Sequence, residues 1–306
     1  MNDSMSTAFI AIVGRPNVGK SSIMNRILGT KVAIVSDKPQ TTRTRIMGIC
    51  NRGDEQLVFI DTPGLHRPHN KLGEQMVKAV GDSVGDVDAG LLVIDATAVA
   101  ADNTPAPAER ELAERFGQLH LPAVLAINKI DLVRDRERLL AIIAEYSKLY
   151  DFSAVVPISA KTGDGVDSLL GELSHFAEEG PHYFDDTALT DQSERVIAAE
   201  MIREKMLRLL DKEVPHGVAV SIEKFKDRQT SSGEDIIDIE AIIYCESDNH
   251  KGIIIGKGGA MLKNISTRAR RDMERFFDCK VNLTCWVKVK EDWRNRAGLI
   301  HTFGLD

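Results

Sequence analysis

The sequence predicts two domains: an α/β domain with a mixed, mostly parallel sheet, followed by a small α+β domain. Three observations predict this. The first ~175 residues alternate apolar runs with helical patterns, a polar aperiodic stretch follows, and the remainder has the order α-β-β-α-α-β. A chain of 306 residues suits two domains, and 43% apolar with 28% charged residues is typical of globular proteins. We expect a first domain at 1–178, a linker at 179–192 and a second domain at 193–306.

Five apolar runs predict the strands of the first domain. Four are dense in Val, Ile and Leu, as expected for strands that are buried on both faces. The runs are Phe9–Val13, Gln56–Ile60, Gly90–Ile94, Ala123–Ile127 and Val155–Ile158. Helical patterns lie between them, for example at 138–150 and 166–177. The run Ile46–Cys50 and the polar residues 51–54 precede Gln56–Ile60, which predicts one antiparallel hairpin at the sheet edge.

A phosphate-binding loop follows the first predicted strand and opens a helix. Its residues fit GxxxxGK[ST] and run into a second serine: Gly14, Arg15, Pro16, Asn17, Val18, Gly19, Lys20, Ser21 and Ser22. Glycines let backbone N–H groups close around phosphates, and the helix N-terminus favours negative charge there. We expect Lys20 to reach the β- and γ-phosphates and Ser21 to ligate Mg²⁺. The loop alone does not choose between ATP and GTP.

Three further motifs each follow a predicted strand. They are Asp61-Thr62-Pro63-Gly64, Asn128-Lys129-Ile130-Asp131 and Ser159-Ala160-Lys161. We expect Asp61 to hold Mg²⁺ through a water and the Gly64 N–H to contact the γ-phosphate. The Asp131 carboxylate can accept hydrogen bonds from guanine N1–H and N2–H₂, a donor pair that adenine lacks. Asn128 is expected to tie its loop to the phosphate loop, and the Lys129 stem to cover the base.

The last of these motifs would offer a backbone N–H to guanine O6. Ligands bind at the carboxyl ends of strands in open α/β sheets, so the placement of all four motifs is consistent with one site. Their order along the chain predicts a Ras-like P-loop G domain that binds GTP and GDP.

The stretch 40–45, Gln-Thr-Thr-Arg-Thr-Arg, lies between the phosphate loop and the DTPG motif. One hydroxyl here is expected to complete Mg²⁺ ligation when GTP is bound, and to be released after hydrolysis. We favour Thr42, with Thr41 as the alternative. A second switch is expected to begin at Asp61 and to run through the polar stretch 66–73.

The residue after Gly64 is Leu65, where Ras-like proteins usually carry the glutamine that orients the attacking water. Hydrolysis should therefore be slow or should rely on another group. Asn17 is a candidate ligand for a monovalent cation, K⁺, that would sit between the phosphates; the alternative is that its side chain stabilises the loop. The candidate catalytic residues are Lys20, Thr42, Gly64 and Asn17.

A glycine turn in the second domain predicts contact with a nucleic-acid backbone, because no side chain blocks close approach. Positive charge is concentrated around it: residues 249–296 hold 12 Lys+Arg against 5 Asp+Glu, although the whole chain carries −7. The surrounding element order favours a KH module, which clamps about four nucleotides. The alternatives are an ordinary helix–turn–helix glycine and a solvated basic face. The candidate RNA-binding residues are Gly256, Lys257, Gly258, Gly259, Lys263, Arg270 and Arg271.

Composition argues against other classes of protein. No run approaches the ~18 apolar residues of a membrane span, and the short polar N-terminus does not resemble a secretory signal. We therefore expect a cytoplasmic protein. The cysteines form no CxxC pair and no histidine cluster accompanies them, which favours buried reduced thiols over zinc ligands or disulfides. They are Cys50, Cys245, Cys279 and Cys285.

The chain resembles the Era family, bacterial GTPases with a C-terminal type II KH domain. In the first half the resemblance rests on GRPNVGKSS, QTTRTR, DTPG, NKID and SAK. In the second half it rests on GPHYF, AAEMIREKMLRLLDKEVPHGVAVSIE, IIGKGG and VKVKEDWRN. The tail after Asn295 does not match the expected family ending, and the loop 98–108 also looks local to this protein.

This resemblance implies hydrolysis of GTP to GDP and phosphate. It also implies binding to the 3′ end of 16S rRNA, with the nucleotide state gating RNA binding, and a role in maturation of the 30S ribosomal subunit. Peripheral association with the cell membrane and a monomeric state are implied too. The alternative is a slow-hydrolysing, nucleotide-gated RNA-binding scaffold or timer, because of Leu65. GTPases of tRNA modification or membrane transport carry other accessory domains.

Overall fold

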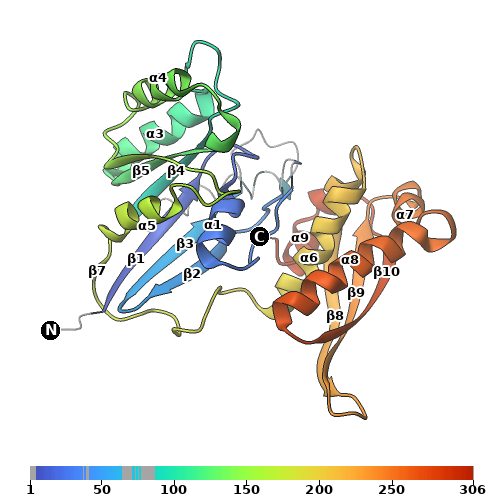
Figure 1. The fold of residues 1–306 in the computed structure, drawn as a ribbon. Helices are drawn as coiled ribbons and strands as arrows, with labels where there is room; N and C mark the ends of the chain where they lie inside the picture. Colours follow the sequence, from blue (N-terminus) through green and yellow to red (C-terminus); the bar gives the residue numbers. More distant parts are fainter. Residues whose placement is uncertain are drawn as a thin grey trace. The chain divides into compact units, whose positions relative to one another are not determined.

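The computed structural model describes residues 5–36, 38, 41–63, 71, 72, 74, 76 and 87–305. By their contacts the described residues form two compact units (Figure 1). The first unit takes in Met1–Ala33, Thr42–Arg67 and Gln75–Asp191, and the second takes in Ile34–Thr41, Pro68–Glu74 and Gln192–Asp306. Residues 179–191 of the predicted linker thus cluster with the first unit, and Gln192 clusters with the second. Residues 34–41 cluster with the second unit, although they precede most of the first unit in the chain.

The first unit contains a mixed sheet with the strand order β2-β3-β1-β4-β5-β6. Its strands are β1 Ser6–Val13, β2 Ile46–Arg52, β3 Glu55–Asp61, β4 Ala89–Asp95, β5 Ala123–Asn128 and β6 Ala154–Pro157. β2 is antiparallel to β3, and the remaining neighbours on this path are parallel. The short β7, Glu178–Glu179, pairs antiparallel with β1. The predicted mostly parallel sheet with a hairpin at its edge is confirmed.

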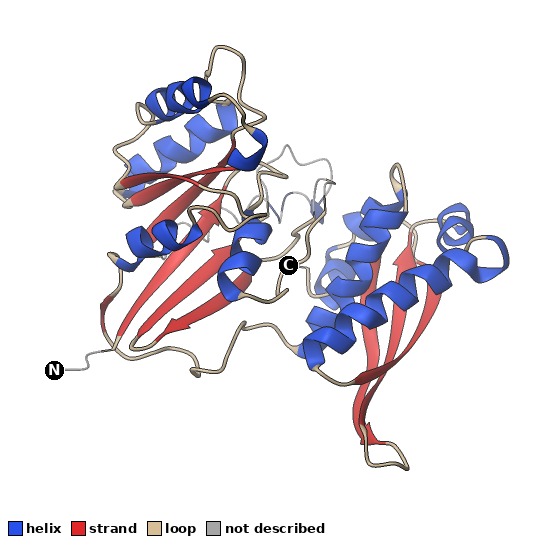
Figure 2. Ribbon diagram, in the orientation of Figure 1, coloured by secondary structure: helices blue, strands red, loops and turns tan. Residues whose placement is uncertain are grey.

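Helices cover both faces of this sheet (Figure 2). The helices α1 Lys20–Leu28 and α5 Val166–Ser174 share one hydrophobic core with the sheet. The helices α3 Pro107–Leu119 and α4 Arg136–Tyr146 share a core on the other face. Residues of β1 alternate between the two cores, so that Ile10 and Ile12 face one while Ala11 and Val13 face the other. This double burial is the reason that the strand sequences are continuously apolar.

Two helices have boundaries that differ from the predicted ones, and local capping explains the earlier start of the first. The helix predicted at 138–150 begins at Arg136, since the side chain of Asp135 accepts hydrogen bonds from the N–H groups of Glu137 and Arg138. It ends at Tyr146. The helix predicted at 166–177 ends at Ser174.

The second unit is a three-stranded sheet with the order β10-β9-β8. Its strands are β8 Ala219–Gln229, β9 Asp235–Cys245 and β10 Lys280–Val289, and its larger helices are α6 Glu194–Leu209, α7 Asp248–Ile255 and α8 Ala260–Phe277. β9 is antiparallel to β8 and parallel to β10. One hydrophobic core joins α6 and α8 to the sheet. The order α6-β8-β9-α7-α8-β10 is the predicted α-β-β-α-α-β.

The tail after Asn295 is part of this second unit. It forms the short helix α9, Ala297–Thr302, followed by Phe303. The Phe303 ring lies 4.9 Å from the ring of Tyr244 and 5.4 Å from that of Trp293, measured between centroids. Trp293 is fully buried, and its Nε1 donates to the Gly217 carbonyl at 2.9 Å. The tail is therefore anchored by aromatic packing.

Short 3₁₀ turns complete the described structure: η1 Ile130–Leu132, η2 Val214–Gly217, η3 Lys257–Gly259 and η4 Trp293–Asn295. The four cysteines are all free. Among the described residues, no helix combines the length and the apolar character needed to span a bilayer.

Candidate functional site

The phosphate loop joins β1 to α1. The side chain of Asn128 connects it by hydrogen bonds to the loops that follow β5 and β6. Asn128, at the end of β5, donates from Nδ2 to the Val18 carbonyl at 2.8 Å and accepts on Oδ1 from the Ala160 N–H at 3.0 Å. Gly19 has φ 106°, and a Cβ there would lie 2.2 Å from Asn128 Nδ2. Only glycine fits at this approach. The structure thus brings together three of the four motifs through one buried amide.

Lys20 lies inside the phosphate loop. Its Nζ donates to the carbonyls of Gly14 and Arg15, both at 3.0 Å, and the residue is only 6% exposed. Burial lowers the pKa of Lys20 to about 8, although the charge of Asp61 acts in the opposite direction. An anion at the loop would restore the ordinary pKa of this ammonium group. Pro16 lies in the same loop, and Ser22 follows in the first turn of α1.

Three oxygen-bearing side chains converge beside this lysine. Ser21 Oγ donates to Asp61 Oδ2 at 2.6 Å and lies 3.1 Å from Thr42 Oγ1, while Thr42 Oγ1 lies 3.4 Å from Asp61 Oδ2. Asp61 is fully buried, and its Oδ1 has no hydrogen-bond partner in the described structure. Burial raises the pKa of Asp61, opposed by Lys20, Ser21 and Thr42. Hydroxyls and an unsatisfied carboxylate oxygen suit Mg²⁺, a hard cation with oxygen ligands, so these residues fit such an ion.

The two candidate threonines lie in different surroundings. Thr42 is buried beside Ser21 and Asp61, whereas Thr41 Oγ1 donates to the Lys38 carbonyl at 2.7 Å. The geometry therefore favours Thr42 as the hydroxyl that would complete a Mg²⁺ site. In the next motif, Thr62 Oγ1 donates to the Ile12 carbonyl at 2.9 Å, which fixes the chain just before Pro63. Gly64, Leu65 and most of the expected second switch at 66–73 lie outside the described residues.

The expected guanine-binding residues surround the end of β5. Asp131 accepts a hydrogen bond on Oδ1 from Ser159 Oγ at 2.8 Å, which orients the carboxylate. Lys129 donates from Nζ to the Asn17 carbonyl at 2.8 Å and to Asp95 Oδ2 at 2.6 Å, so its stem is stretched along the site. Lys161 follows Ala160 in the loop after β6, and Arg26 of α1 donates to the carbonyls of both residues.

Asp95 was not among the residues predicted from the sequence. Burial raises the pKa of this carboxyl, but hydrogen bonds from Lys129 and Thr97 outweigh it and the net shift is downward. The sequence feature that could have identified Asp95 is its position directly after the apolar run Gly90–Ile94, which places it at the same sheet edge as the motifs. It carries no motif of its own, so spacing alone could not select it.

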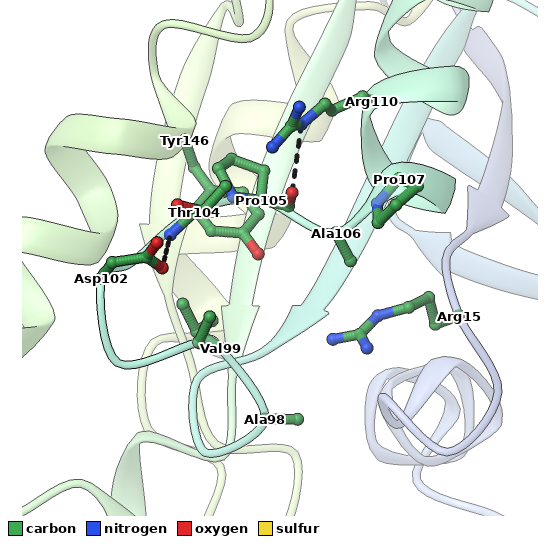
Figure 3. A pocket seen from close by; sticks show the side chains of 11 residues that line it. Arg15, Ala98, Val99, Asp102, Thr104, Pro105, Ala106, Pro107, Arg110 and Tyr146 are labelled. Atoms are coloured by element: carbon green, nitrogen blue, oxygen red, sulfur yellow. Dashed lines mark hydrogen bonds between the residues drawn. The ribbon is translucent and has the colours of Figure 1, made fainter.

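Arg15 makes its side-chain contacts away from Lys20, beside a cavity of about 340 Å³ that Figure 3 shows. Arg15 Nε donates to Glu109 Oε1 at 2.7 Å, and the Tyr146 hydroxyl donates to Glu109 Oε2 at 2.6 Å. Glu109 is fully buried and lies on α3. Burial, and then this carboxylate, raise the pKa of Tyr146 well above its ordinary value. The Arg15 side chain thus connects the phosphate loop to α3 through its ion pair with Glu109. The Arg15 backbone carbonyl accepts a hydrogen bond from Lys20.

In the second unit, the turn between α7 and α8 exposes backbone at its glycines. Gly256, Gly258 and Gly259 all have positive φ, and Gly258, at φ 59°, has open space where a Cβ would stand. The side chains of Lys257, Lys263 and Arg271 are exposed and make no hydrogen bond or ion pair within the described part of the chain. Arg270, in contrast, is paired with Glu274 at 2.6 Å. Three of the four predicted basic residues are therefore available to a polyanion.

Comparison with known proteins agrees with both units. The model of the 50S ribosome-binding GTPase family matches residues 9–129, and the model of the KH domain matches residues 213–294. The chain is 48% identical to GTPase Era of Ruminiclostridium cellulolyticum over 301 residues and 48% identical to GTPase Era of Clostridioides difficile over 300 residues. Each alignment covers 98% of both chains.

Solved structures show the same arrangement of elements. One is a crystal structure of Era in complex with MgGDPNP and nucleotides 1506–1542 of 16S ribosomal RNA, and another is a variant of Aquifex aeolicus Era bound to GDP.AlF4−. Both match with a TM-score of 0.91 at 38% identity, over 98% of this chain and 99% of the other. The phosphate loop, the guanine motifs, the KH turn and relatives of full length all agree, and the chain belongs to the Era family of GTPases.

Proposed function

We propose that this GTPase is a switch that binds the 3′ end of 16S rRNA through its KH turn and acts in maturation of the 30S ribosomal subunit. The observation that carries the proposal is a relative with the same fold over both units, described in complex with MgGDPNP and 16S rRNA nucleotides. This chain has a candidate site for each of these ligands. The first unit has a phosphate loop beside a cluster of side-chain oxygens, and the second unit has an exposed basic turn.

For GTP, the chain's own groups position the phosphates and the base. Lys20 would exchange its bonds to the loop carbonyls for bonds to the β- and γ-phosphates. Ser21 and Thr42 would ligate Mg²⁺ directly, and Asp61 through a water, with its unpartnered Oδ1 available for the purpose. When bound, Mg²⁺ neutralises charge that develops on the phosphate oxygens. Asp131, oriented by Ser159, would accept the two guanine N–H donors.

Leu65 gives the chain no glutamine to orient the attacking water, so we propose that K⁺ contributes to hydrolysis. Asn17 is the proposed ligand: it is exposed on the phosphate loop, and its backbone has φ 64°. A cation there would lie beside the phosphates and would stabilise the charge that builds up in the transition state. The Leu65 side chain has no polar group that could orient the attacking water. This also supports a second candidate function, a slow-hydrolysing RNA-binding scaffold or timer.

Single-turnover hydrolysis of GTP separates these two candidates. The rate would be measured in K⁺ and in Na⁺ buffer, each with and without an RNA that carries the 3′ end of 16S rRNA. We expect hydrolysis to be faster in K⁺ by about tenfold or more, and Asn17→Ala to remove the difference. We also expect the RNA to change the rate. Equal rates in K⁺ and Na⁺ would remove the role of Asn17, and a uniformly slow rate that RNA leaves unchanged would favour the scaffold.

The remaining expectations concern where and in what form the protein works. Action on the 30S subunit in the cytoplasm is part of the proposal, supported by the relative described with 16S rRNA. The monomeric state stays a prediction from the family resemblance. Peripheral association with the cell membrane stays a prediction from the family resemblance.

A further inference from the structure

Asp95, the last residue of β4, has a carboxylate that is fixed by the chain that follows it. Its Oδ1 accepts from the Thr97 N–H at 2.9 Å and from Thr97 Oγ1 at 2.6 Å. The Asp95 carbonyl accepts from the Ala98 N–H at 3.0 Å, which closes a turn over the same residues. Aspartate side chains favour such turns because they can bond to the backbone two residues on. With Oδ1 held in this way, Oδ2 points in one defined direction.

The other oxygen of this carboxylate accepts from a lysine of the expected guanine motif. Lys129 Nζ donates to Asp95 Oδ2 at 2.6 Å and to the Asn17 carbonyl of the phosphate loop at 2.8 Å. Asp95 and Asn128, the residue before Lys129, are partners on the parallel strands β4 and β5. The Ala96 N–H also donates to the Asn128 carbonyl at 3.0 Å. The sheet therefore sets the place of the carboxylate relative to the lysine.

This pair is charged and largely shielded from water. The side chain of Asp95 is 10% exposed and that of Lys129 is 32% exposed. Burial raises the pKa of Asp95, but hydrogen bonds from Lys129 and Thr97 lower it overall, so the carboxylate is ionised at neutral pH. Shielded charges are screened less by salt than charges at the surface, and a charge-assisted hydrogen bond is stronger than a neutral one. Asp95 is thus a strong restraint on the flexible stem of Lys129.

The restrained stem is the one expected to cover the guanine base. Asp131, two positions further along the chain, is the expected acceptor for the guanine N–H groups. Without the carboxylate of Asp95, the Lys129 ammonium group would keep its bond to the Asn17 carbonyl, but the stem could adopt other rotamers. Each nucleotide that binds would then have to order the stem, and a cost of this kind weakens binding.

We propose that Asp95 is a positioning residue for guanine nucleotides: its carboxylate, held by Thr97, fixes Lys129 in the extended form that would cover the base. The proposal rests on the proposed role of Lys129 beside the base. GTP and GDP carry the same base, so loss of the carboxylate should weaken both by the same factor. The base is bound alike before and during hydrolysis, so KM for GTP should rise while kcat stays the same.

The test compares Asp95→Asn, Lys129→Met and the double variant in the full chain. Asparagine keeps an oxygen for Thr97 and places an amide N–H₂ opposite the ammonium group, and methionine keeps a flexible apolar stem without the charge. Asp102→Asn is the control, because Asp102 accepts from the Thr104 N–H at 3.0 Å in the same Asp-x-Thr pattern. Fluorescence titration would give dissociation constants for Mg²⁺–GDP and a Mg²⁺–GTP analogue. Steady-state hydrolysis would give KM and kcat, and a thermal melt would check folding.

We expect Asp95→Asn to weaken both nucleotides and to raise KM by about tenfold, as suits the loss of a charge-assisted hydrogen bond, with kcat unchanged. Asp102→Asn should change none of these values. Because Asp95 acts through Lys129, Asp95→Asn should cause no further loss in the Lys129→Met background.

Three results would overturn the proposal: unchanged affinities in Asp95→Asn, a loss for the GTP analogue alone, or losses that multiply in the double variant. If Lys129→Met itself binds both nucleotides normally, the proposed role of Lys129 fails as well, which distinguishes the two failures. None of these measurements involves RNA, so they are independent of whether the KH turn binds 16S rRNA.

Discussion

At the scale of single residues, the nucleotide site holds two buried charges whose surroundings disfavour them. Burial lowers the pKa of Lys20 to about 8, and burial raises the pKa of Asp61. The two groups attract each other, but not enough to cancel either shift. A polyphosphate would stabilise the ammonium group, and a divalent cation would stabilise the carboxylate. The electrostatics of these residues therefore favour a ligand that combines a negatively charged polyphosphate with a divalent cation.

A proton should be taken up when GDP binds at alkaline pH. Above pH 8 the Lys20 of the free protein is mostly neutral, whereas in the complex the phosphates should hold it charged. Binding at pH 8.5 should thus take up roughly three quarters of a proton, and affinity should fall as the pH rises above about 8. Calorimetric titration with Mg²⁺–GDP in two buffers of different ionisation enthalpy measures the uptake. The same heat in both buffers would show that the pKa of Lys20 does not change on binding.

At the scale of elements, the strands could be predicted well from the sequence, and the connections less well. Burial on both faces leaves continuous apolar runs such as Gly90–Ile94, which identify β4 directly. The linker shows no periodicity because several of its contacts are single hydrogen bonds between a side chain and a backbone group. Thr7 Oγ1 donates to the Pro181 carbonyl at 3.1 Å, and Thr190 Oγ1 donates to the Met47 carbonyl at 2.6 Å. Hydrogen bonds of this kind leave no pattern that sequence reasoning could detect.

A buried glutamine on β3 also attaches the linker. Gln56 is fully buried; its Oε1 accepts from the N–H groups of Tyr183 and Phe184 at 2.9 and 3.0 Å, and its Nε2 donates to the Phe184 carbonyl at 3.0 Å. This one amide matches three backbone groups of the linker. The linker should therefore come off the sheet when the amide is lost, because its polar backbone would otherwise be left unpaired.

Gln56→Leu should make the linker susceptible to proteolysis. Loss of the three bonds should favour the detached linker by about 2 kcal/mol, and cleavage within 180–191 should become faster by at least about tenfold. Limited proteolysis followed by mass spectrometry measures this. Gln118→Leu removes the same amide from the exposed face of α3 and serves as the control. If both variants are cleaved at the rate of the unaltered chain, Gln56 does not hold the linker.

At the scale of the whole molecule, motif order predicted the two activities, but not which residues belong to which unit. The four nucleotide motifs and the glycine turn are local patterns, so each could be found by spacing. The attachment of Val35 and Thr41 to α6 joins groups more than 160 positions apart, such as Thr41 and Arg203, and has no local signature. Burial of Arg203 and Glu204 on α6 also contradicts the usual expectation that charged residues lie at the surface.

Within the second unit, the same buried network extends from the Val35 N–H to the helix that follows the KH turn. Glu204 accepts from Lys205, and Lys205 donates to Asp272 of α8. Burial lowers the pKa of Lys205, but its bonds to Asp272 and Glu204 outweigh this and raise it overall. Hydrogen bonds through Glu204 and Lys205 therefore connect the Val35 backbone to α8 within this unit.

The most direct test of the proposal that nucleotide state gates RNA binding is the affinity for the 3′ end of 16S rRNA with a GTP analogue, with GDP and without nucleotide. Salt must be fixed, because phosphate contacts make RNA affinity depend strongly on it. Two variants place one extra carboxylate in glycine positions with open space and positive φ: Gly258→Asp in the KH turn and, as the control, Gly233→Asp in the loop at the other end of β9.

We predict the tightest RNA binding with the GTP analogue, a loss of about tenfold or more in Gly258→Asp, and little change in Gly233→Asp. By reciprocity, RNA should then tighten binding of the GTP analogue by the same factor. Equal RNA affinity in all three nucleotide states would contradict the account, since the switch would then be read by a partner other than this RNA.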